Sequence, residues 1–213
     1  MPFQYPIPRC DNVVDDHFGM PVPDPYRWME APSSPELRTF IEAENALTQE
    51  LLEEVPARQT IADRLTALYS TPQVPAWRKM SRQGEHYFYS YNDGQNQASI
   101  WRRRGVDGPS EVALDPNQLS VDGSAILMET QPSPDGRLLA YGVSNGGTDW
   151  RTFYVRDIET GTDYPEMLEW CKFTSVVWTP DSSGFFYNRF DAVKPGEEKD
   201  HAPAAARPAT SRW

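Results

Sequence analysis

The sequence predicts a mainly β protein with an N-terminal helical segment, in which the β part is an incomplete β-propeller. Three observations predict this fold. From about residue 76 onward, apolar residues alternate with a period of two, as they do in strands. Aromatic residues make up 12% of the chain, and flat rings pack well on pleated sheets. A motif that consists of a turn and an aromatic-rich strand also recurs along the chain.

The recurring motif indicates a propeller in particular. One copy occupies residues 133–141, a second occupies residues 179–187, and a weaker third occupies residues 81–89. The two strong copies end on Tyr141 and Tyr187. Successive copies are offset by 52 and 46 residues, and periods of about 40–50 residues with about four strands each are typical of propeller blades. The alternative is coincidence, because a turn before a strand is common in any β protein.

Residues 1–71 form the first predicted region, an arm followed by helices. Residues 1–35 are rich in proline, which fixes φ and lacks an amide donor, so we expect an extended, irregular arm. Ser34 is a suitable N-cap and Pro35 a suitable first residue for a helix that Pro56 ends. A second, short helix with one apolar face follows it.

Residues 72–191 form the second region, the partial propeller. Runs with a period of two, divided by turn residues such as those in Asn92-Asp93-Gly94, predict short antiparallel strands. These strands are expected at residues 87–91, 98–103, 111–114, 126–131, 137–143, 151–157, 174–179 and 184–190.

Residues 192–213 form the third region. From His201 onward the sequence is rich in Ala, Pro and Arg and has neither a helical nor a strand period, which predicts disorder. The composition changes abruptly after Asp200, as a shifted reading frame would produce.

Charge and cysteine usage exclude several classes of function. The net charge of −11 argues against a nucleic-acid-binding protein, which needs Lys and Arg for phosphate contacts. Cys10 and Cys171 are too few for a disulfide framework, and with no Cys/His cluster we expect two free thiols, no metal and no cofactor. No apolar run is long enough to span a membrane, and no signal peptide precedes the arm, so we expect a cytoplasmic protein.

Three segments of the chain together resemble one known family. The first is VPDPYRWME at residues 22–30, which leads into FIEAEN at 40–45. The second is YFYSYNDG at 87–94, with Gln97 and then LDPN at 114–117. The third is GGTDW at 146–150, followed by Lys172-Phe173, Trp178-Thr179 and FYNR at 186–189. In this order and spacing they resemble the prolyl oligopeptidase family over residues 5–191, and only the tail is unmatched.

The resemblance implies a seven-bladed propeller that covers an α/β-hydrolase domain. The family consists of serine endopeptidases that cleave short peptides after proline, and its propeller filters substrates by size. By that plan, residues 1–71 are a hydrolase-side segment and residues 72–191 are about two and a half blades of the expected seven. The catalytic Ser, Asp and His belong to the hydrolase domain, which is absent from this chain, so we expect the chain alone to be inactive. Its partners would be short proline-containing peptides and that missing domain, with neither nucleic acid nor membrane.

Ser144 lies in a Gly-x-Ser-x-Gly motif, which marks a catalytic nucleophile only where a strand turns into a helix. Here residues 147–155 after the motif alternate like a strand, so the motif is a hairpin turn and Ser144 is not expected to be catalytic. A triad also needs a positioned histidine. His17 and His86 precede the serine, contrary to the order in this class of hydrolase, and His201 lies in the irregular tail.

Phe173, Asp149 and Trp150 match family positions. The resemblance implies that Phe173 lines the substrate pocket for a residue upstream of the scissile proline, and the alternative is an ordinary core aromatic. It also implies that Asp149 and Trp150 lie toward the domain interface, where a carboxylate could pair with a hydrolase-side arginine. The alternative for Asp149, which we favour from the sequence, is a turn residue that bonds its own backbone.

Two other functions stay open. A free-standing partial propeller could be a peptide- or protein-binding module, but such a module should end in a capped, polar strand rather than an Ala/Pro/Arg tail. An active hydrolase that uses Ser144 is the least favoured.

Overall fold

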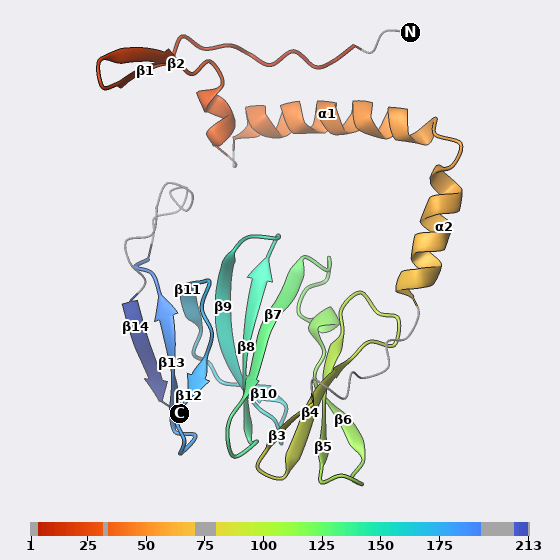
Figure 1. The fold of residues 1–213 in the computed structure, drawn as a ribbon, viewed down its shortest axis with the longest axis vertical. Coiled ribbons are helices and arrows are strands. Elements are labelled where there is room, and N and C mark those ends of the chain that lie inside the picture. The colour runs from red at the N-terminus through yellow and green to blue at the C-terminus, as the bar shows by residue number, and fades with distance from the viewer. Residues whose placement is uncertain (1–3, 32–33, 71–79, 193–206, 213) are drawn as a thin grey trace. The chain divides into compact units, whose positions relative to one another are not determined.

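The computed structural model describes residues 4–31, 34–70, 80–192 and 207–212 (Figure 1). The chain divides into two compact units between Thr66 and Ala67. This division falls inside a helix, whereas the predicted boundary after residue 71 lies outside the described residues.

The first unit contains a hairpin and helices. Its elements are β1 (Val14–His17), β2 (Met20–Pro23), the 3-10 helix η1 (Arg27–Glu30), α1 (Pro35–Glu53) and α2 (Arg58–Tyr69), the last of which crosses into the second unit. The predicted start of α1 is confirmed, because Ser34 is its N-cap and the Ser34 Oγ accepts a hydrogen bond of 3.4 Å from the Leu37 amide.

The arm is more regular than the sequence predicts. Phe18 and Gly19 have positive φ at the turn between β1 and β2, and the Asp16 carboxylate accepts a hydrogen bond of 2.7 Å from the Gly19 amide. The prolines in β2 are compatible with this sheet because it has only two strands. Each strand forms backbone hydrogen bonds along one edge only, and proline, which lacks an N–H, is tolerated on such edge strands. The expectation of an arm without regular structure was therefore wrong for residues 14–23.

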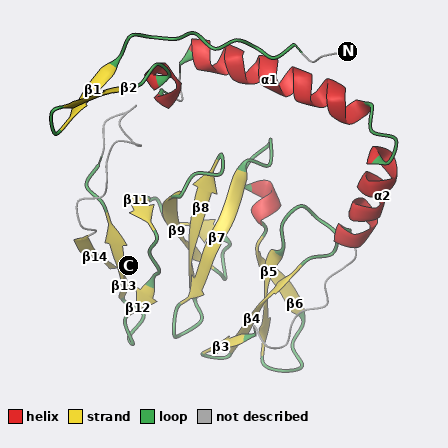
Figure 2. Ribbon diagram, turned by 45° about the horizontal axis from the view of Figure 1, so that its top comes forward, coloured by secondary structure: helices red, strands yellow, loops and turns green. Residues whose placement is uncertain are grey.

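In the described residues, the strands of the second unit form three separate antiparallel sheets (Figures 1 and 2). The first contains β3 (Ser81–Gln83), β4 (His86–Tyr91), β5 (Ser99–Arg104) and β6 (Ser110–Leu114) and is followed by the 3-10 helix η3 (Pro116–Gln118). The second contains β7 (Ala125–Pro132), β8 (Leu138–Asn145), β9 (Trp150–Asp157), β10 (Thr162–Asp163) and β11 (Leu168–Lys172). The third contains β12 (Val177–Trp178), β13 (Gly184–Arg189) and β14 (Arg207–Arg212).

The sheets confirm the incomplete propeller. Strands pair in sequence order within each sheet, apart from β11, which pairs with β9 beside β10. Tyr141 lies on β8 and Tyr187 on β13, and each of these is the second strand of its own sheet. The recurring motif therefore marks equivalent places in neighbouring blades, and the strands do not form one continuous barrel.

The core consists of two layers that share the second sheet. On one side, Leu139, Tyr141 and Val143 of β8 pack with residues of the first sheet such as Phe88 and Leu114. On the other side, the alternate β8 residues Leu138 and Ala140 pack with residues of the third sheet, which include Trp178, Phe185 and Tyr187. Residues 138–144 are all buried. Successive side chains of β8 therefore pack alternately against the first and the third sheet, rather than alternating between core and solvent.

The turns of the recurring motif also bring the sheets together. Gly84 and Gly136 occupy equivalent positions in two copies, and both have positive φ. A Cβ at Gly84 would lie 2.5 Å from the Asp135 carbonyl oxygen, and one at Gly136 would lie 2.5 Å from the Gln83 carbonyl oxygen. The third copy has Ser182 at this position, also with positive φ, and its Oγ accepts a hydrogen bond of 3.1 Å from the Asp135 amide. The contact between turns is thus repeated from sheet to sheet.

The tail differs from its prediction. Residues 207–212 form β14, which pairs antiparallel with β13 from Arg189↔Arg207 to Gly184↔Arg212. The expectation of disorder was wrong for this segment, because the free edge of β13 offers backbone partners to an added strand whatever its side chains. Residues 193–206, including His201, lie outside the described part of the chain.

The close approach of the turns predicts an unequal cost for two glycine substitutions. Gly136→Ala combines a positive φ with a clash against a backbone oxygen, and we expect a loss of about 3 kcal/mol of unfolding free energy. Gly147→Ala is the matched control, because Gly147 also has positive φ but open space around it, and should cost about 1 kcal/mol. Urea unfolding of both variants measures the difference. Equal losses would contradict the role of the turn contact.

Candidate functional site

Ser144 is part of a hairpin and not of a nucleophile elbow. It lies on β8, which turns at Gly146-Gly147 into the antiparallel strand β9, and no helix follows. The Ser144 side chain is 1% exposed, and its Oγ donates a hydrogen bond of 2.5 Å to the Thr148 carbonyl oxygen. A hydroxyl that is buried and bonded to its own turn stabilises the hairpin and is closed to a substrate.

The histidines show no triad geometry in the described residues. His17 is exposed on β1 in the first unit. His86 lies at the start of β4, where its Nε2 is 3.7 Å from the Glu159 carboxylate, and no hydrogen bond joins it to a serine. No group of three or more His, Cys, Asp or Glu side chains in the described part could hold a metal ion. No helix in the described ranges is long and apolar enough to cross a membrane.

The three residues that resemble family positions lie in one cluster around Lys172. The Lys172 Nζ is 3.2 Å from Asp149 Oδ2, and it also lies 5.4 Å from the ring centre of Trp150 and 5.1 Å from that of Phe173. Lys172 pairs directly across from Trp150 in the β11–β9 ladder, which brings together two residues that lie 22 positions apart in the sequence. The sequence did not predict this cluster. We expected Asp149 to pair either with an arginine of the hydrolase domain or with its own backbone, whereas the structure pairs it with Lys172.

Phe173 presents its ring to solvent. It is 73% exposed, so the alternative of a core aromatic is wrong in this structure. Its φ of +50° is a left-handed conformation that bulky residues rarely adopt. Such conformations persist where the surroundings impose them, and they concentrate at binding sites. The ring is held from one side by the Lys172 cation.

A β-bulge in β11 positions the aromatic residues that the sequence reasoning missed. The register against β9 shifts between Leu168 and Cys171, and Trp170 within this interval has a φ of +63°. The Trp170 carbonyl oxygen accepts a hydrogen bond of 2.8 Å from the Phe190 amide. The rings of Trp170 and Phe190 then pack edge-on against Trp150, at 5.8 and 5.7 Å between ring centres. The only sequence signal was the density of aromatics near residue 170.

Charged side chains of the second sheet hold the loop that carries Phe173. The Arg151 guanidinium donates a hydrogen bond of 3.3 Å to the Thr174 carbonyl oxygen and lies 3.7 Å from Glu129. Glu129 in turn accepts a hydrogen bond of 3.3 Å from the Val176 amide. Arg151 and Glu129 are both largely buried, so this pair fixes the backbone on the C-terminal side of Phe173.

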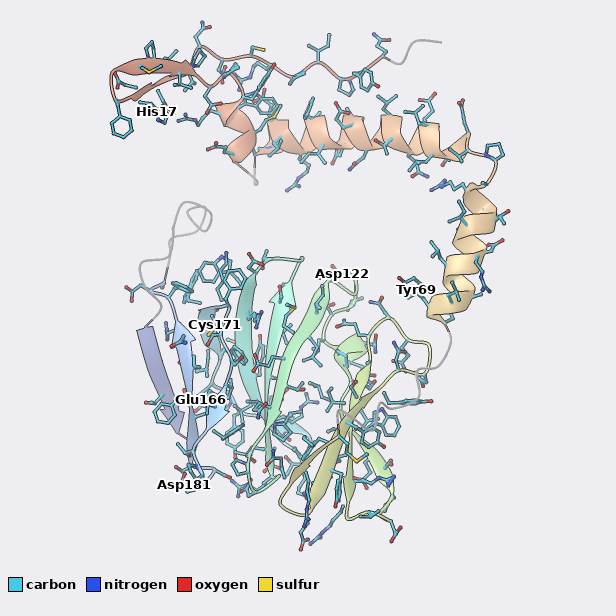
Figure 3. The ribbon with its side chains drawn as sticks, in the orientation of Figure 1. His17, Tyr69, Asp122, Glu166, Cys171 and Asp181 are labelled. Atoms are coloured by element: carbon cyan, nitrogen blue, oxygen red, sulfur yellow. The ribbon has the colours of Figure 1, made fainter. Side chains whose placement is uncertain are left out.

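Both cysteines are free thiols, as the sequence predicts. Cys171 is fully buried on β11 (Figure 3), and burial raises the pKa of its thiol to about 11. Since this lies above the unfolded-state pKa of 9.0, the contribution of the thiol to stability is present below about pH 9 and is lost as the pH rises toward 11. Cys10 is exposed in the first unit.

Comparison with known proteins establishes the family. The family model described as "Prolyl oligopeptidase, N-terminal beta-propeller domain" matches residues 5–205. The chain belongs to the prolyl oligopeptidase family. This match extends past residue 200, into the segment that the sequence reasoning assigned to an unrelated tail.

Two curated proteins of the prolyl oligopeptidase family are similar to this chain over most of its length. The prolyl endopeptidase of Elizabethkingia meningoseptica is 33% identical over 193 residues, which are 91% of this chain and 27% of that protein. The dual function macrocyclase-peptidase POPB of Amanita bisporigera is 35% identical over 225 residues, with 93% of this chain and 30% of that protein covered. The chain thus spans less than a third of the length of these relatives.

Solved structures of the family have the same fold. A structure from a study of two prolyl endopeptidases matches 98% of this chain and 31% of its own chain, with a TM-score of 0.85 and 31% identity. Prolyl oligopeptidase B from Galerina marginata, bound to a 25mer macrocyclization substrate, matches 98% of this chain and 32% of its own, with a TM-score of 0.76 and 28% identity.

The difference in burial predicts two distinct thiol reactivities. Near pH 8, a maleimide should modify Cys10 within minutes, and it should modify Cys171 at least about 100-fold more slowly, because that thiol is inaccessible and its pKa is raised. Mass spectrometry after timed labelling measures both rates. In the Cys10→Ser variant only the slow reaction should remain, and in denaturant both thiols should react quickly. Rapid native labelling of Cys171 would contradict the packing of β11.

Proposed function

We propose that this chain forms the propeller side of a serine endopeptidase that cleaves short peptides after proline, and that its blades restrict access to the catalytic site. Membership of the prolyl oligopeptidase family supports the reaction class. The observation that carries the proposal is the cluster around Lys172, which holds an aromatic side chain, Phe173, out toward solvent on a constrained backbone. An exposed ring that is held in this way is suited to bind an apolar group of a ligand.

In this proposal Phe173 contacts the peptide residue upstream of the scissile proline. Asp149 and Trp150 face the hydrolase domain, and Asp149 is 59% exposed in its side chain, which leaves its carboxylate accessible beside Lys172. A second cation, such as an arginine of the hydrolase domain, could share the carboxylate with Lys172, because ionised carboxylates accept several hydrogen bonds. The catalytic domain and short proline-containing peptides are thus the proposed partners, in the cytoplasm.

We also propose that the chain alone has no peptidase activity. Ser144 is buried and bonded to Thr148, and neither His17 nor His86 is hydrogen-bonded to it. Without an activated hydroxyl, the propeller blades bind and orient but do not cleave.

A chimera tests the proposed function. Residues 5–205 would replace the matching region of the Elizabethkingia meningoseptica prolyl endopeptidase. We expect the chimera to cleave a short proline-containing peptide, and we expect no cleavage by the 213-residue chain alone. In the chimera, Phe173→Ala should raise KM about tenfold with little change in kcat, because the lost contact serves ground-state and transition-state binding alike.

Two further variants serve as controls for the chimera. Phe173→Tyr keeps the ring and should restore most of the affinity. Ser144→Ala should leave kcat within about twofold, since the proposal gives this serine a structural role only. Loss of activity on Ser144→Ala with an unchanged fold, or a KM that does not respond to Phe173→Ala, would contradict the assignment of these residues.

A further inference from the structure

Thr174, the residue directly after Phe173, is bound by two neighbouring sheets. Its carbonyl oxygen accepts a hydrogen bond of 3.3 Å from the Arg151 guanidinium of β9, in the second sheet. Its Oγ1 accepts a hydrogen bond of 2.9 Å from the backbone amide of Asn188 on β13, in the third sheet. Thr174 is 5% exposed, so water competes little for these bonds. One buried residue thus ties the loop that carries Phe173 to two blades.

The Thr174 hydroxyl extends the hydrogen bonding of β13 beyond its strand partner. The short strand β12 pairs with the first half of β13 only. The backbone amides of Asn188 and Phe190 lie two positions apart in extended chain, so they point to the same side. Asn188 donates to Thr174 Oγ1, and Phe190 donates to the Trp170 carbonyl oxygen at 2.8 Å. The hydroxyl therefore takes the place that a backbone carbonyl would have in a longer neighbouring strand.

Phe173 lies between two anchored residues. On its N-terminal side, Lys172 pairs with Trp150 in the β11–β9 ladder, and on its C-terminal side Thr174 is held by both sheets. The φ of Phe173 is +50°, and this left-handed conformation costs free energy for a residue with a side chain. It persists only while the surroundings impose it. If the Thr174 anchor is released, the backbone of Phe173 relaxes and its ring leaves the Lys172 cation, which lies 5.1 Å from the ring centre.

We propose that Thr174 is a positioning residue, whose buried hydroxyl holds the Phe173 ring in the exposed orientation that binds substrate. The importance of this orientation for the peptidase rests on the proposed function of Phe173. The hydroxyl itself is buried and bonded to the third sheet, so it acts on a substrate only through the ring. The orientation of the ring can be measured on the chain alone, without any peptidase activity.

Lys172 reports the position of the ring in the 213-residue chain. Its Nζ lies near the rings of Trp150 and Phe173, so its ε-methylene protons should have ring-current shifts from both. The sequence contains only four lysines, so labelling with carbon-13 lysine gives few NMR signals, and Lys172→Arg assigns the one that matters. Phe173→Ala removes one ring and sets the scale of the shift.

Two substitutions of Thr174 separate the hydroxyl from the shape of the side chain. Thr174→Val keeps the shape and removes the hydroxyl, and it should move the Lys172 signal at least about half as far as Phe173→Ala does, in the same direction, because the Asn188 amide loses its acceptor. Thr174→Ser keeps the hydroxyl and should leave the signal close to its native position.

Thr179→Val is the matched control for a loss of stability alone. The Thr179 Oγ1 also accepts a hydrogen bond from a backbone amide, that of Gly184, at 3.2 Å. This bond lies at the opposite end of β13, in the turn that contains Asp181 (labelled in Figure 3). Urea unfolding should show that Thr179→Val and Thr174→Val both remain folded and both lose stability. Thr179→Val should leave the Lys172 signal unchanged.

The chimera with the Elizabethkingia meningoseptica prolyl endopeptidase tests the consequence for substrate binding. Thr174→Val should raise KM about fivefold with kcat within about twofold, and Thr174→Ser should restore KM to within about twofold. Added to Phe173→Ala, Thr174→Val should raise KM by no more than about 1.5-fold further, because a residue that acts through the ring has no effect once the ring is absent.

The outcomes distinguish this inference from the proposed function. An unmoved Lys172 signal in Thr174→Val would overturn the inference. An equal rise in KM with and without the Phe173 ring, or an equal rise in Thr179→Val, would overturn it as well, because each would show a general loss of structure. A KM that does not respond to Phe173→Ala contradicts the proposed function instead, and the Lys172 signal then still decides whether Thr174 holds the ring.

Discussion

The burial of β8 on both faces is the constraint on which the blades depend. Its residues contribute alternately to two apolar layers, with Leu139 and Tyr141 in one and Leu138 and Ala140 in the other. Gly142 continues the second row, where a Cβ would lie 3.0 Å from the Phe153 ring, so its missing side chain makes room for that ring. Each large apolar side chain that is buried stabilises the fold by about 1.5–3 kcal/mol. The second sheet buries apolar side chains on both of its faces, so it holds the first and third sheets without a continuous ladder of hydrogen bonds between sheets.

The few hydrogen bonds between sheets fix their register instead. Gln97 lies in the loop after β4. Its side-chain Nε2 donates to the Ala125 carbonyl oxygen at 2.7 Å and its Oε1 accepts from the Leu127 amide at 3.0 Å, so its amide group binds the start of β7, the first strand of the next sheet. The Trp178 Nε1 donates to the Gln131 carbonyl oxygen at 2.9 Å from the other side. Together with the turn contacts, these bonds place the β8–β9 hairpin and β11 so that Trp150, Lys172 and Phe173 meet.

The sequence predicted the parts of the structure that depend on local chemistry. The N-cap at Ser34, the period-two strands and the recurring turns each need only a short segment, and the structure confirms them. The sequence placed Ser144 in a hairpin for the same reason, since the strand after the motif was visible in the alternation, although the structure puts Ser144 at the end of β8 and not in the turn itself. The three sequence-predicted site residues, Asp149, Trp150 and Phe173, do lie together. They meet because β9 pairs with β11, which sets Trp150 opposite Lys172, 22 positions away in the sequence, and no local pattern encodes this pairing.

The parts that the sequence did not predict depend on partners elsewhere in the chain. β14 forms because β13 has a free edge, and its Arg-Pro-Ala sequence has little strand propensity of its own. The bulge at Trp170 and the left-handed conformation of Phe173 are imposed by β9, Phe190 and the Arg151–Glu129 pair, so they leave no mark in residue preferences. For the same reason Lys172 was not singled out, although it lies at the centre of the cluster.

Native-state amide hydrogen exchange across the second unit tests the central role of β8 most directly. The amides of Tyr141 and Val143, on a strand paired on both sides and buried on both faces, should exchange at the slowest rates in the chain, near the limit set by global unfolding. Those of the short edge strand β3 should exchange at least about 100-fold faster, through local opening. Exchange of the β8 amides at the rate of β3 would contradict the account, because it would show that the shared middle sheet does not hold the blades together.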